Sequence, residues 1–474
     1  MSTNGGGNNP KLKRVETTTD TLTSRAGLSA LVRFKDSINL SPLVDQKFGS
    51  IRKHDKGISV VDAFHQAICF FWDGTDFALK QFDRLKQQTG YARTIEQQPD
   101  DMATSYQMKR FFKGFNFRNN HQFRHLLQEL FTWQINHHNP DVIRLDLDTV
   151  VLDNDDANQR EGVEPTHENV KGFKPLLLKW NGRVVDFVFR GGDKHCNNGE
   201  TVMKMIRHVT KRIREDYDSD VPIVLTADNA FMDQKNFREF EQLGIGYIVG
   251  GKKHDDLIEE VRKKGDSSWE RIKQACLPES VKGGTYRVTE LRDERDSWET
   301  SRRALYCQLL KEDEQRTLGL RETVYYTNIG VDKQITDRLL QTGKVTWLTK
   351  RKLVQLAHGR GKSELVHRKL KEFGPEKLPL KSFEANHAYY GTMLVAYSLY
   401  CSFQEQVTDE VISEEVMSTD CYPSTFRRRF LDVAGKVVSH SGELFLKITE
   451  DVMSRLGMKE VFERANSPPA PALC

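Results

Sequence analysis

The feature that most restricts the fold of this chain is a change of hydrophobic period close to residue 142. From residue 28 to about residue 139, apolar residues recur at helical spacing. From 143 to 152, apolar and polar residues alternate, which is the period of a strand with one buried face. Asp146 and Asp148 share the polar face. A helical region is therefore expected before a sheet whose first strand carries two carboxylates.

Further strand and helix patterns follow in an order typical of a mixed α/β sheet. Strand patterns at 174–180 and 183–190 are joined by Asn181-Gly182, which predicts a two-residue hairpin turn. A helix, a buried strand, a second helix and a last strand are predicted at 199–217, 221–227, 234–243 and 245–249.

Asp228 follows the buried strand predicted at 221–227. Ligand sites in open α/β sheets lie beyond the carboxyl ends of the strands, so Asp148 and Asp228 are candidates for one site. A lone aspartate at a strand end can equally well cap the following turn. Asp146 shares the strand face of Asp148 and is the alternative to it, and Asp148 is preferred because it lies nearer the strand end.

The rest of the sequence divides by composition and period into further regions. Residues 1–24 are rich in Gly, Asn, Thr and Ser and predict a disordered arm. The other predicted regions are a helical domain at 25–140, the first part of the sheet core at 141–251, a β-rich insertion at 252–345, the second part of the core at 346–405, and a C-terminal helical region with a tail at 406–474. Basic residues interleaved with aromatics at 109–118 suit DNA binding by the helical domain, although aromatics at helical spacing are more often core. The tail beyond about residue 467 is rich in Pro and Ala and is expected to be disordered.

Composition excludes several classes of protein. The seven cysteines are scattered and contain no CxxC pair, which argues against a disulfide framework and a cysteine-built zinc site. No stretch approaches the roughly 18 uninterrupted apolar residues of a membrane span. The N-terminus lacks the apolar segment of a secretory signal. A cytoplasmic protein without a membrane partner is therefore expected.

Positive charge is concentrated in one segment although the whole chain carries only +4. Residues 344–381 contain eleven Lys/Arg and three Asp/Glu. This suits phosphate binding, although a solvated basic helix face would have the same composition. Gly359 to Ser363 superficially resembles a nucleotide-binding loop, but that motif needs a glycine where the chain has Leu356.

The basic segment also contains a third candidate carboxylate. On a helix through 350–373, Arg360, Glu364 and Lys371 would fall within about 40° of one another. One face would then carry a carboxylate between two cations that can hold phosphates. The alternative is an exposed helix with Glu364 paired to Arg368 at i, i+4.

These motifs resemble those of bacterial insertion-sequence transposases of the DDE type. The Arg-x3-Glu-x6-Lys spacing of Arg360, Glu364 and Lys371 is similar to their YREK signature, with Ala357 at the tyrosine position and His358 beside it. Leu-Asp-Leu-Asp-Thr-Val at 145–150 and Ala-Asp-Asn-Ala-Phe at 227–231 resemble the two aspartate motifs of the group numbered thirteen-eighty. The similarity extends from about residue 24 to 450.

The resemblance implies a fold and an activity. The expected fold is α/β: a ribonuclease-H-like mixed sheet with a β-rich insertion before the glutamate helix and an α-helical N-terminal domain. The expected activity is metal-dependent cut-and-paste transposition, with hydrolysis at the element ends and transfer of the 3′-hydroxyl into target DNA. A metal-dependent nuclease of the same fold and a catalytically silent DNA-binding descendant are the alternatives.

The resemblance also implies the site residues and the partners. Asp148, Asp228 and Glu364 would hold two Mg²⁺ ions, for which Mn²⁺ can substitute. The predicted DNA-binding residues are Arg360, Lys362, Arg368, Lys371 and Trp298. Trp298 would stack on a DNA base, and burial in the insertion is its structural alternative. The expected partners are terminal inverted repeats, target DNA and a second copy of the chain, in the cytoplasm at the nucleoid.

Overall fold

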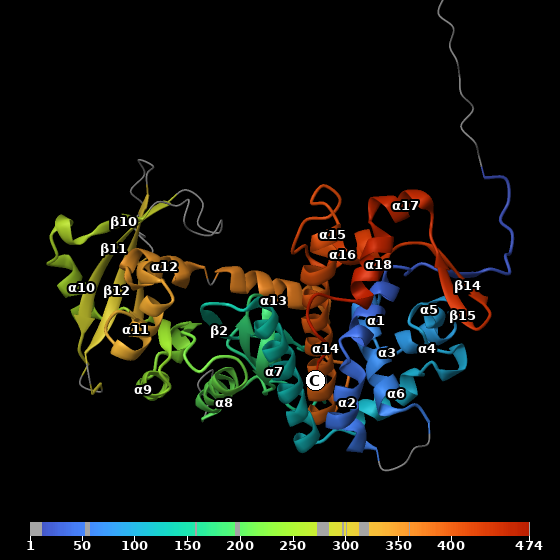
Figure 1. Ribbon diagram of the computed structural model, residues 1–474. Coiled ribbons are helices and arrows are strands. Elements are labelled where there is room, and N and C mark those ends of the chain that lie inside the picture. The colour runs from blue at the N-terminus through green and yellow to red at the C-terminus, as the bar shows by residue number, and fades with distance from the viewer. Residues whose placement is uncertain are drawn as a thin grey trace, which may run out of the picture.

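The computed structural model describes residues 12–52, 57–156, 159–194, 200–272, 284–295, 298–299, 301–311, 322–359 and 361–473, and of 284–285, 311 and 361–364 it describes the backbone only. Figure 1 shows strands β10 to β12 at the left-hand end of the molecule, β2 of the same sheet near the middle, and a helical bundle on the right. The N-terminal helices and the C-terminal segments both belong to this bundle.

Two sets of elements make up the described chain. The strands are β1 (Thr21–Thr23), β2 (Ile143–Thr149), β3 (Leu152–Asp153), β4 (Glu164–Pro165), β5 (Lys171–Phe173), β6 (Leu176–Trp180), β7 (Arg183–Val188), β8 (Ile223–Ala227), β9 (Gly246–Gly251), β10 (Glu270–Ile272), β11 (Gly284–Asp293), β12 (Arg302–Lys311), β13 (Glu322–Thr327), β14 (Gly435–His440) and β15 (Glu443–Lys447). The helices are α1 (Leu28–Ser37), α2 (Leu40–Phe48), α3 (Val60–Asp73), α4 (Gln81–Lys86), α5 (Thr89–Thr94), α6 (Ser105–Lys113), α7 (Phe117–His138), α8 (Thr201–Asp216), α9 (Gln234–Gln242), α10 (Asp255–Arg262), α11 (Lys333–Gln341), α12 (Lys350–His358), α13 (Gly361–Phe373), α14 (Phe383–Phe403), α15 (Asp409–Val411), α16 (Pro423–Phe426), α17 (Glu450–Arg455) and α18 (Met458–Asn466). The chain also forms short helical turns of other types, which include η3 (Asn229–Phe231), η8 (Gln404–Thr408) and η9 (Arg427–Leu431).

The main sheet is mixed, and β2 lies inside it. Its strand order is β10-β11-β12-β13-β9-β8-β2-β6-β7. Strand β2 pairs parallel with β8 and antiparallel with β6, and β8 pairs parallel with β9. The β6–β7 hairpin turns at Asn181 and Gly182, which both have the positive φ that a two-residue hairpin turn requires. The meander, helix, strand, helix, strand order expected from the sequence is therefore present.

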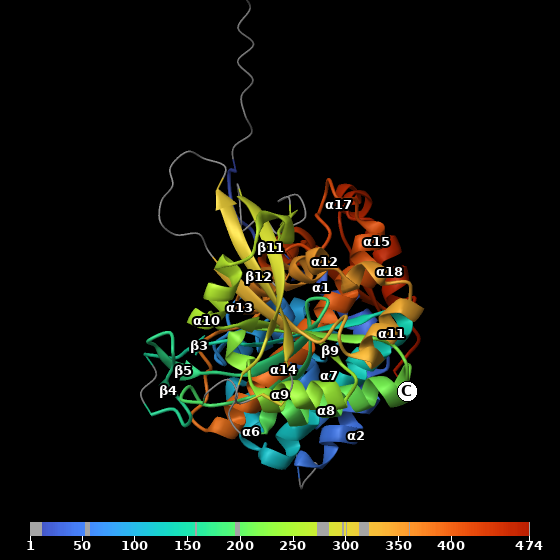
Figure 2. The same cartoon turned by 90° about the vertical axis from the view of Figure 1, so that its left-hand side faces the viewer.

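The segment expected as a β-rich insertion continues this sheet. Its strands β10 to β13 pair in antiparallel sequence, and β13 then pairs with the core strand β9. Figure 2 shows the long strands β11 and β12 on the side of the molecule that faces the viewer. The core and the insertion are thus parts of one hydrogen-bonded sheet.

The two faces of β2 contact different layers. Ile143, Leu145 and Leu147 are buried in a cluster with residues of α8 and α9. The opposite face carries Arg144, Asp146 and Asp148, and Arg144 donates to the Leu356 carbonyl of α12 at 2.5 Å. Alternation along one strand therefore separates the apolar core from a polar layer, as the strand period predicts.

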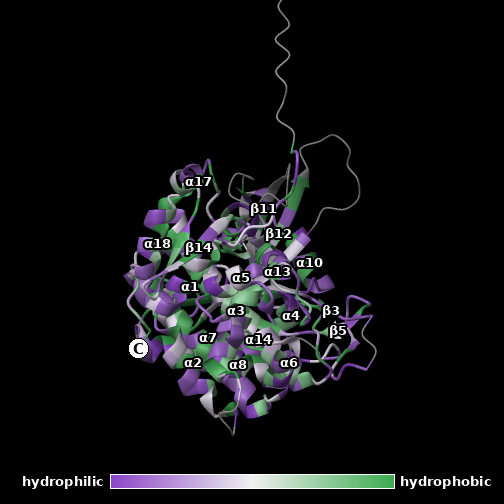
Figure 3. Cartoon of the chain, turned by 90° about the vertical axis from the view of Figure 1, so that its right-hand side faces the viewer, coloured by the Kyte–Doolittle hydropathy of each residue, from purple (hydrophilic) through white to green (hydrophobic). Residues whose placement is uncertain are grey.

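Helix α14 is the centre of the helical bundle. Almost all of its residues are buried, and a helix that is apolar all round belongs in a core. The Trp72 indole donates to the Ala396 carbonyl at 3.0 Å, and the Tyr389 hydroxyl donates to the Phe77 carbonyl at 3.1 Å. Figure 3 views this end of the molecule and shows the largely hydrophobic α3 beside it. Within the described chain, no helix has both the length and the apolarity to cross a membrane.

The guanidinium of Arg427 joins three parts of the chain. It donates to the carbonyls of Phe71 and Trp72 at 2.7 and 3.0 Å, in the last turn of α3. It also donates to the carbonyls of Glu372 and Phe373 at 2.9 and 2.7 Å, in the last turn of α13. Burial lowers the pKa of Arg427 to about 10. One cation therefore satisfies carbonyls at two helix C-termini, where the helix dipole also favours positive charge.

Both chain ends differ from the sequence prediction. Residues 21–23, expected in a disordered arm, form β1 and pair with β14, more than 400 positions later. The tail, expected to be disordered, packs on the bundle. The Trp133 indole donates to the Pro471 carbonyl at 2.5 Å, and the Leu473 amide donates to the Ile38 carbonyl at 2.8 Å. The composition of these two segments could not reveal either contact, because the partner of each segment is distant in sequence.

Three histidines of α7 and α8 pack closely, and His387 of α14 lies near enough to His121 to interact with its charge. The rings of His121 and His125 are 4.9 Å apart between centroids, and those of His125 and His208 are 5.5 Å apart. Burial lowers the pKa of His125 to about 4, and the neighbouring histidines and Arg124 add to the effect. Burial, with Arg124 and His121, lowers the pKa of His387 to about 3. The folded protein therefore favours neutral imidazoles here.

We expect Arg427→Ala to lower the free energy of unfolding by about 3 kcal/mol, because buried carbonyls lose a charged donor. Arg427→Lys should recover only part of the loss, since an ammonium cannot reproduce the guanidinium fork. Urea unfolding followed by circular dichroism measures both. Arg118→Ala, at an exposed position of α7, is the control. Equal unfolding midpoints for Arg427→Ala and Arg118→Ala would contradict this role.

Acid should destabilise the protein through the histidine cluster. The stability gained by keeping His125 and His387 neutral is fully present above about pH 6.5 and is lost as pH falls from 6.5 towards 4. The unfolded chain binds protons in this window that the folded chain does not. Urea midpoints near pH 7.5 and near pH 4.5 should differ less in His125→Gln than in the unmodified chain. An unchanged difference would rule out His125 as a contributor.

Candidate active site

The carboxylates of β2 lie at the carboxyl half of a central strand. Asp146 accepts a hydrogen bond from the Thr226 hydroxyl of β8 at 3.1 Å. Asp148 accepts one from the amide of Thr149 at 2.9 Å. The side chains of both aspartates are about 15% exposed, so solvent and a substrate can still reach them.

Asp228 directly follows the neighbouring parallel strand, β8. It is the N-cap of η3, and its side chain accepts from the Ala230 amide at 2.9 Å. Its backbone is still extended, with φ −83° and ψ −179°. The capping role that a lone aspartate can have is therefore real, and it coexists with a place at the strand end.

The register of β2 and β8 places Asp148 and Asp228 next to one another. The parallel ladder pairs Asp146 with Thr226 and Leu147 with Ala227, so the next positions along it are Asp148 and Asp228. Neighbouring strands are about 4.8 Å apart. Asp146 lies opposite a threonine instead. The geometry therefore favours Asp148 over Asp146 as the partner of Asp228.

Two basic side chains that the sequence argument did not assign meet these carboxylates. The ammonium of Lys179 lies 3.1 Å from Asp146 and 3.6 Å from Asp148, and its side chain is only 3% exposed. It also approaches Nε2 of His367 at 3.1 Å, and that nitrogen is 3.7 Å from Asp148. Lys179 pairs directly with Asp146 across the antiparallel ladder. A lysine within the apolar run Leu-Leu-Leu-Lys-Trp was the available signal, since buried lysines need a charged partner.

His367 shows where the predicted glutamate helix lies. It belongs to α13, and its contact with Asp148 places this helix against the polar face of β2. Glu364 lies in the backbone of α13 one turn earlier. The side chains of Glu364 and Lys362 are outside the described part of the chain, and so is Arg360 altogether. The backbone therefore brings the helix of the third candidate carboxylate to the strand face that carries Asp148.

The helix expected over 350–373 is divided in two. Helix α12 ends at His358 and α13 begins at Gly361. Of the single helical face proposed for Arg360, Glu364 and Lys371, the backbone of Glu364 and Lys371 lies in α13, and Arg360 is outside the described residues. Gly-Arg-Gly at 359–361 is a sequence with low helix propensity, which explains the division.

The other predicted DNA-binding residues have described partners of their own. Lys371 approaches Glu376 at 3.1 Å, and Arg368 approaches Glu372 at 3.5 Å. Trp298 is partly buried. It packs edge-on against Tyr326 with ring centroids 5.1 Å apart, and the guanidinium of Arg302 lies 5.6 Å from its ring centroid.

A cavity of about 560 Å³ adjoins the carboxylate face. Asp146 and Lys179 form part of its wall. Burial raises the pKa of Asp409, also in the wall, to about 6. Its other charged lining residues are Arg144, Arg183, Lys369, Glu405 and Asp420.

The donor chemistry of this site fits a divalent cation. Aspartate oxygens are the ligands that Mg²⁺ prefers, and the Lys179 ammonium already lies between two of these carboxylates. Among the side chains that the structure describes, no group of three or more His, Cys, Asp and Glu could hold a metal ion. The Glu364 side chain is not among them. A metal held here would therefore need ligands beyond the described aspartates.

The fold and the site together define a mixed α/β protein with an acidic centre at the carboxyl edge of its sheet. The family model described as transposase DDE domain group 1 matches residues 7–468, and the chain belongs to this family. A solved piggyBac transposase synaptic complex with hairpin DNA is similar over 87% of this chain and 82% of that chain, at 12% sequence identity and a TM-score of 0.38. No curated protein matches the sequence.

Replacing Lys179 should increase the repulsion between the carboxylates of Asp146 and Asp148, because its ammonium pairs with both. We expect Lys179→Met to reduce the free energy of unfolding by about 3 kcal/mol, because it leaves two partly buried charges without their cation. The double variant Lys179→Met, Asp146→Asn should regain part of this loss. Thermal unfolding in the presence of a chelator measures both changes. The control is Lys204→Met, at an exposed position of α8. No recovery in the double variant would show that charge balance is not the cause.

Proposed function

We propose that this protein is a DNA transposase of the insertion-sequence group numbered thirteen-eighty, which cuts at the ends of its own element and joins them to target DNA. Membership of the transposase DDE domain family supports this proposal. The spacing of Arg360, Glu364 and Lys371 supports the narrower assignment to that group. Its partners would be the terminal inverted repeats, target DNA and a second copy of the chain, at the nucleoid.

The observation that carries the proposal is the ladder between β2 and β8. Its register makes Asp148 and Asp228 the next pair along the two strands, and His367 of the helix that carries Glu364 approaches Asp148 at 3.7 Å. Strand order supports the same assignment. Around β2 the strand order is β9-β8-β2-β6-β7. Strand β6 is antiparallel to both of its neighbours, β2 and β7, whereas the pairs β2–β8 and β8–β9 are parallel. This is the arrangement expected of a ribonuclease-H-like core.

The proposed metal ligands are Asp148, Asp228 and Glu364. Two Mg²⁺ ions, or Mn²⁺ in their place, would lower the barrier to phosphodiester attack by activating the entering oxygen and stabilising the leaving one. The carboxylates of Asp148, Asp228 and Glu364 would hold the ions, since carboxylate oxygens are hard ligands of the kind Mg²⁺ prefers. Thr226 keeps Asp146 oriented, and Lys179 offsets the negative charge of the pair on β2.

The substrate steps follow from this site. Attack by water at the end of the element breaks the phosphodiester and leaves a 3′-hydroxyl, which then attacks a target phosphodiester and displaces another 3′-hydroxyl. The basic residues Arg360, Lys362, Arg368 and Lys371 would bind the DNA phosphates that flank the reacting one. Trp298 remains a candidate base-stacking residue in this proposal.

A nuclease of the same fold would cleave and never join. A strand-transfer assay with DNA that flanks the gene separates the two, because a joined product requires the second step. A silent DNA-binding descendant would bind the element ends and give neither product. Inverted repeats that bracket the reading frame would favour the transposase.

Asp148→Asn, Asp228→Asn and Glu364→Gln should each reduce cleavage of element-end DNA in Mg²⁺ by at least about a hundredfold, because each removes a charged group that stabilises the transition state. Asp146→Asn should retain more activity than Asp148→Asn. Gel analysis of plasmid cleavage measures this, and gel shifts check that end binding persists.

Asp220→Asn is the matched control for these variants, since Asp220 is a surface aspartate whose side chain is 77% exposed. Normal cleavage by Glu364→Gln would remove the glutamate from the mechanism. An inactive Asp146→Asn beside an active Asp148→Asn would exchange the roles of the two aspartates.

A further inference from the structure

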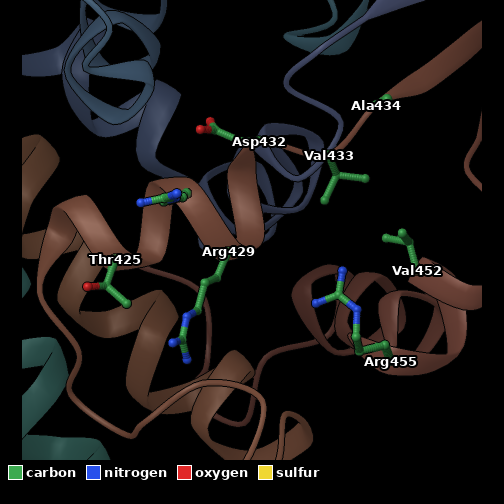
Figure 4. A pocket seen from close by; sticks show the side chains of 8 residues that line it. Thr425, Arg429, Asp432, Val433, Ala434, Val452 and Arg455 are labelled. Atoms are coloured by element: carbon green, nitrogen blue, oxygen red, sulfur yellow. The ribbon is translucent and has the colours of Figure 1, made fainter.

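A second hollow lies in the C-terminal region, away from the carboxylates. It has a volume of about 450 Å³ and lies between η9 and α17. Figure 4 shows Arg429 and Arg455 reaching it from different helical segments. Its lining residues are Thr425, Arg428, Arg429, Asp432, Val433, Ala434, Val452 and Arg455. We call it the arginine cavity.

The positive charge of the arginine cavity is only partly balanced by the carboxylates around it. The Thr449 hydroxyl, with a smaller contribution from Arg455, lowers the pKa of Asp451, which lies one turn before Arg455 on α17. In the part of the chain that the structure describes, Arg428, Arg429 and Arg455 form no ion pair, and Arg429 donates only to the Val416 carbonyl at 2.9 Å. The carboxylate in the wall, Asp432, is engaged by Arg25 instead.

This arrangement differs from that of several less exposed arginines in the same molecule. Arg25, Arg124 and Arg295 each lie within 3 Å of a carboxylate oxygen. Arg428, Arg429 and Arg455 are exposed, so water screens much of their mutual repulsion, but three guanidinium groups around one hollow still make a locally positive surface. Such a surface favours a ligand with negative charge.

The arginine cavity is also mechanically tied to the glutamate helix. Arg428 and Arg429 directly follow Arg427, whose guanidinium holds the last carbonyls of α13. The Ser424 hydroxyl adds a hydrogen bond to Glu372 at 2.7 Å. From Glu364 to the end of α13 is roughly 14 Å along the helix axis. This corresponds to about four base pairs of duplex DNA.

We propose that the arginine cavity binds a backbone phosphate of the DNA, several base pairs from the phosphate that reacts at the carboxylates. This inference rests on the proposed function. A phosphodiester fits because arginine forks donate two hydrogen bonds to phosphate oxygens, and the Thr425 hydroxyl is a further donor in the wall. Through Arg427 and α13, the bound phosphate sets the register of the DNA against Asp148, Asp228 and Glu364.

The test measures DNA binding without divalent metal, so that it does not depend on catalysis. Binding of a labelled duplex from the element end is followed by fluorescence anisotropy over a range of salt concentrations. The variant is Arg428→Ala, Arg455→Ala, which leaves the Arg429 contact with Val416 in place. Its matched control is Lys204→Ala, Lys211→Ala, which removes two exposed cations from α8.

We expect the arginine variant to bind about tenfold more weakly near physiological salt, with the slope of log K against log salt reduced by one to two. The control should change neither quantity by a comparable amount. When a phosphate contact is lost, binding releases fewer counterions and the salt dependence becomes weaker. The change of slope therefore distinguishes lost contacts from a general loss of structure. Melting temperatures check folding, and Arg428→Gln, Arg455→Gln replaces the alanine variant if that variant unfolds.

The possible outcomes separate this inference from the proposed function. Unchanged affinity and slope in the arginine variant, with normal DNA binding by the unmodified chain, would overturn the arginine cavity and leave the transposase intact. Failure of the unmodified chain to bind any DNA would count against both. A melting-temperature increase with inorganic phosphate that the variant loses, without any loss of DNA binding, would assign the cavity to free phosphate and also overturn the proposal.

Discussion

Strand β2 is hydrogen-bonded on one side to a parallel strand and on the other to an antiparallel strand, and most of the candidate site follows from these two ladders. The parallel ladder with β8 sets Asp148 level with Asp228. The antiparallel ladder with β6 sets Lys179 opposite Asp146. A shift of either register by one residue would turn these side chains to the opposite face, into the cluster with α8 and α9. The apolar residues Ile143, Leu145 and Leu147 make such a shift costly, because they would then leave that core.

The polar face of β2 collects charge of both signs in a space that is mostly closed to water. Asp146 and Asp148 repel one another, and Lys179 relieves this repulsion from within the sheet. His367 brings in α13 on the other side. The carboxylates of this face thus already share one protein cation before any substrate is considered. A buried ammonium between two carboxylates also means that a divalent ion would meet a site whose charge is already partly offset, so Lys179 is placed to influence how tightly the ion binds.

Arg427 extends the influence of the site into the helical bundle. By donating to carbonyls at the ends of α3 and α13, it connects the N-terminal helices, the glutamate helix and the C-terminal turn η9. The arginine cavity starts one residue later. A ligand bound in the arginine cavity would therefore be connected to the carboxylates through the buried guanidinium of Arg427 and helix α13.

Local periodicity was enough to predict the elements of the core and two of the candidate carboxylates. Alternation in 143–152, the Asn181-Gly182 turn and the apolar run before Asp228 each depend on neighbours in sequence, and the structure contains the corresponding strands and hairpin. The same reasoning could not find Lys179 or choose Asp148 by geometry. Those results depend on which residues stand opposite one another in paired strands, and strand pairing is a long-range property.

The errors of the sequence prediction have the same origin. Residues 21–23 and the tail beyond 467 have compositions typical of disorder, yet each finds a partner far away, at β14 and on the helical bundle. The sequence by itself determined the periods of helix and strand, the carboxylates on one strand face and the basic character of the glutamate helix, because these depend on the order of neighbouring residues. Only the tertiary structure decided the lysine between the aspartates and the arginine cavity, because each depends on segments that meet only after folding.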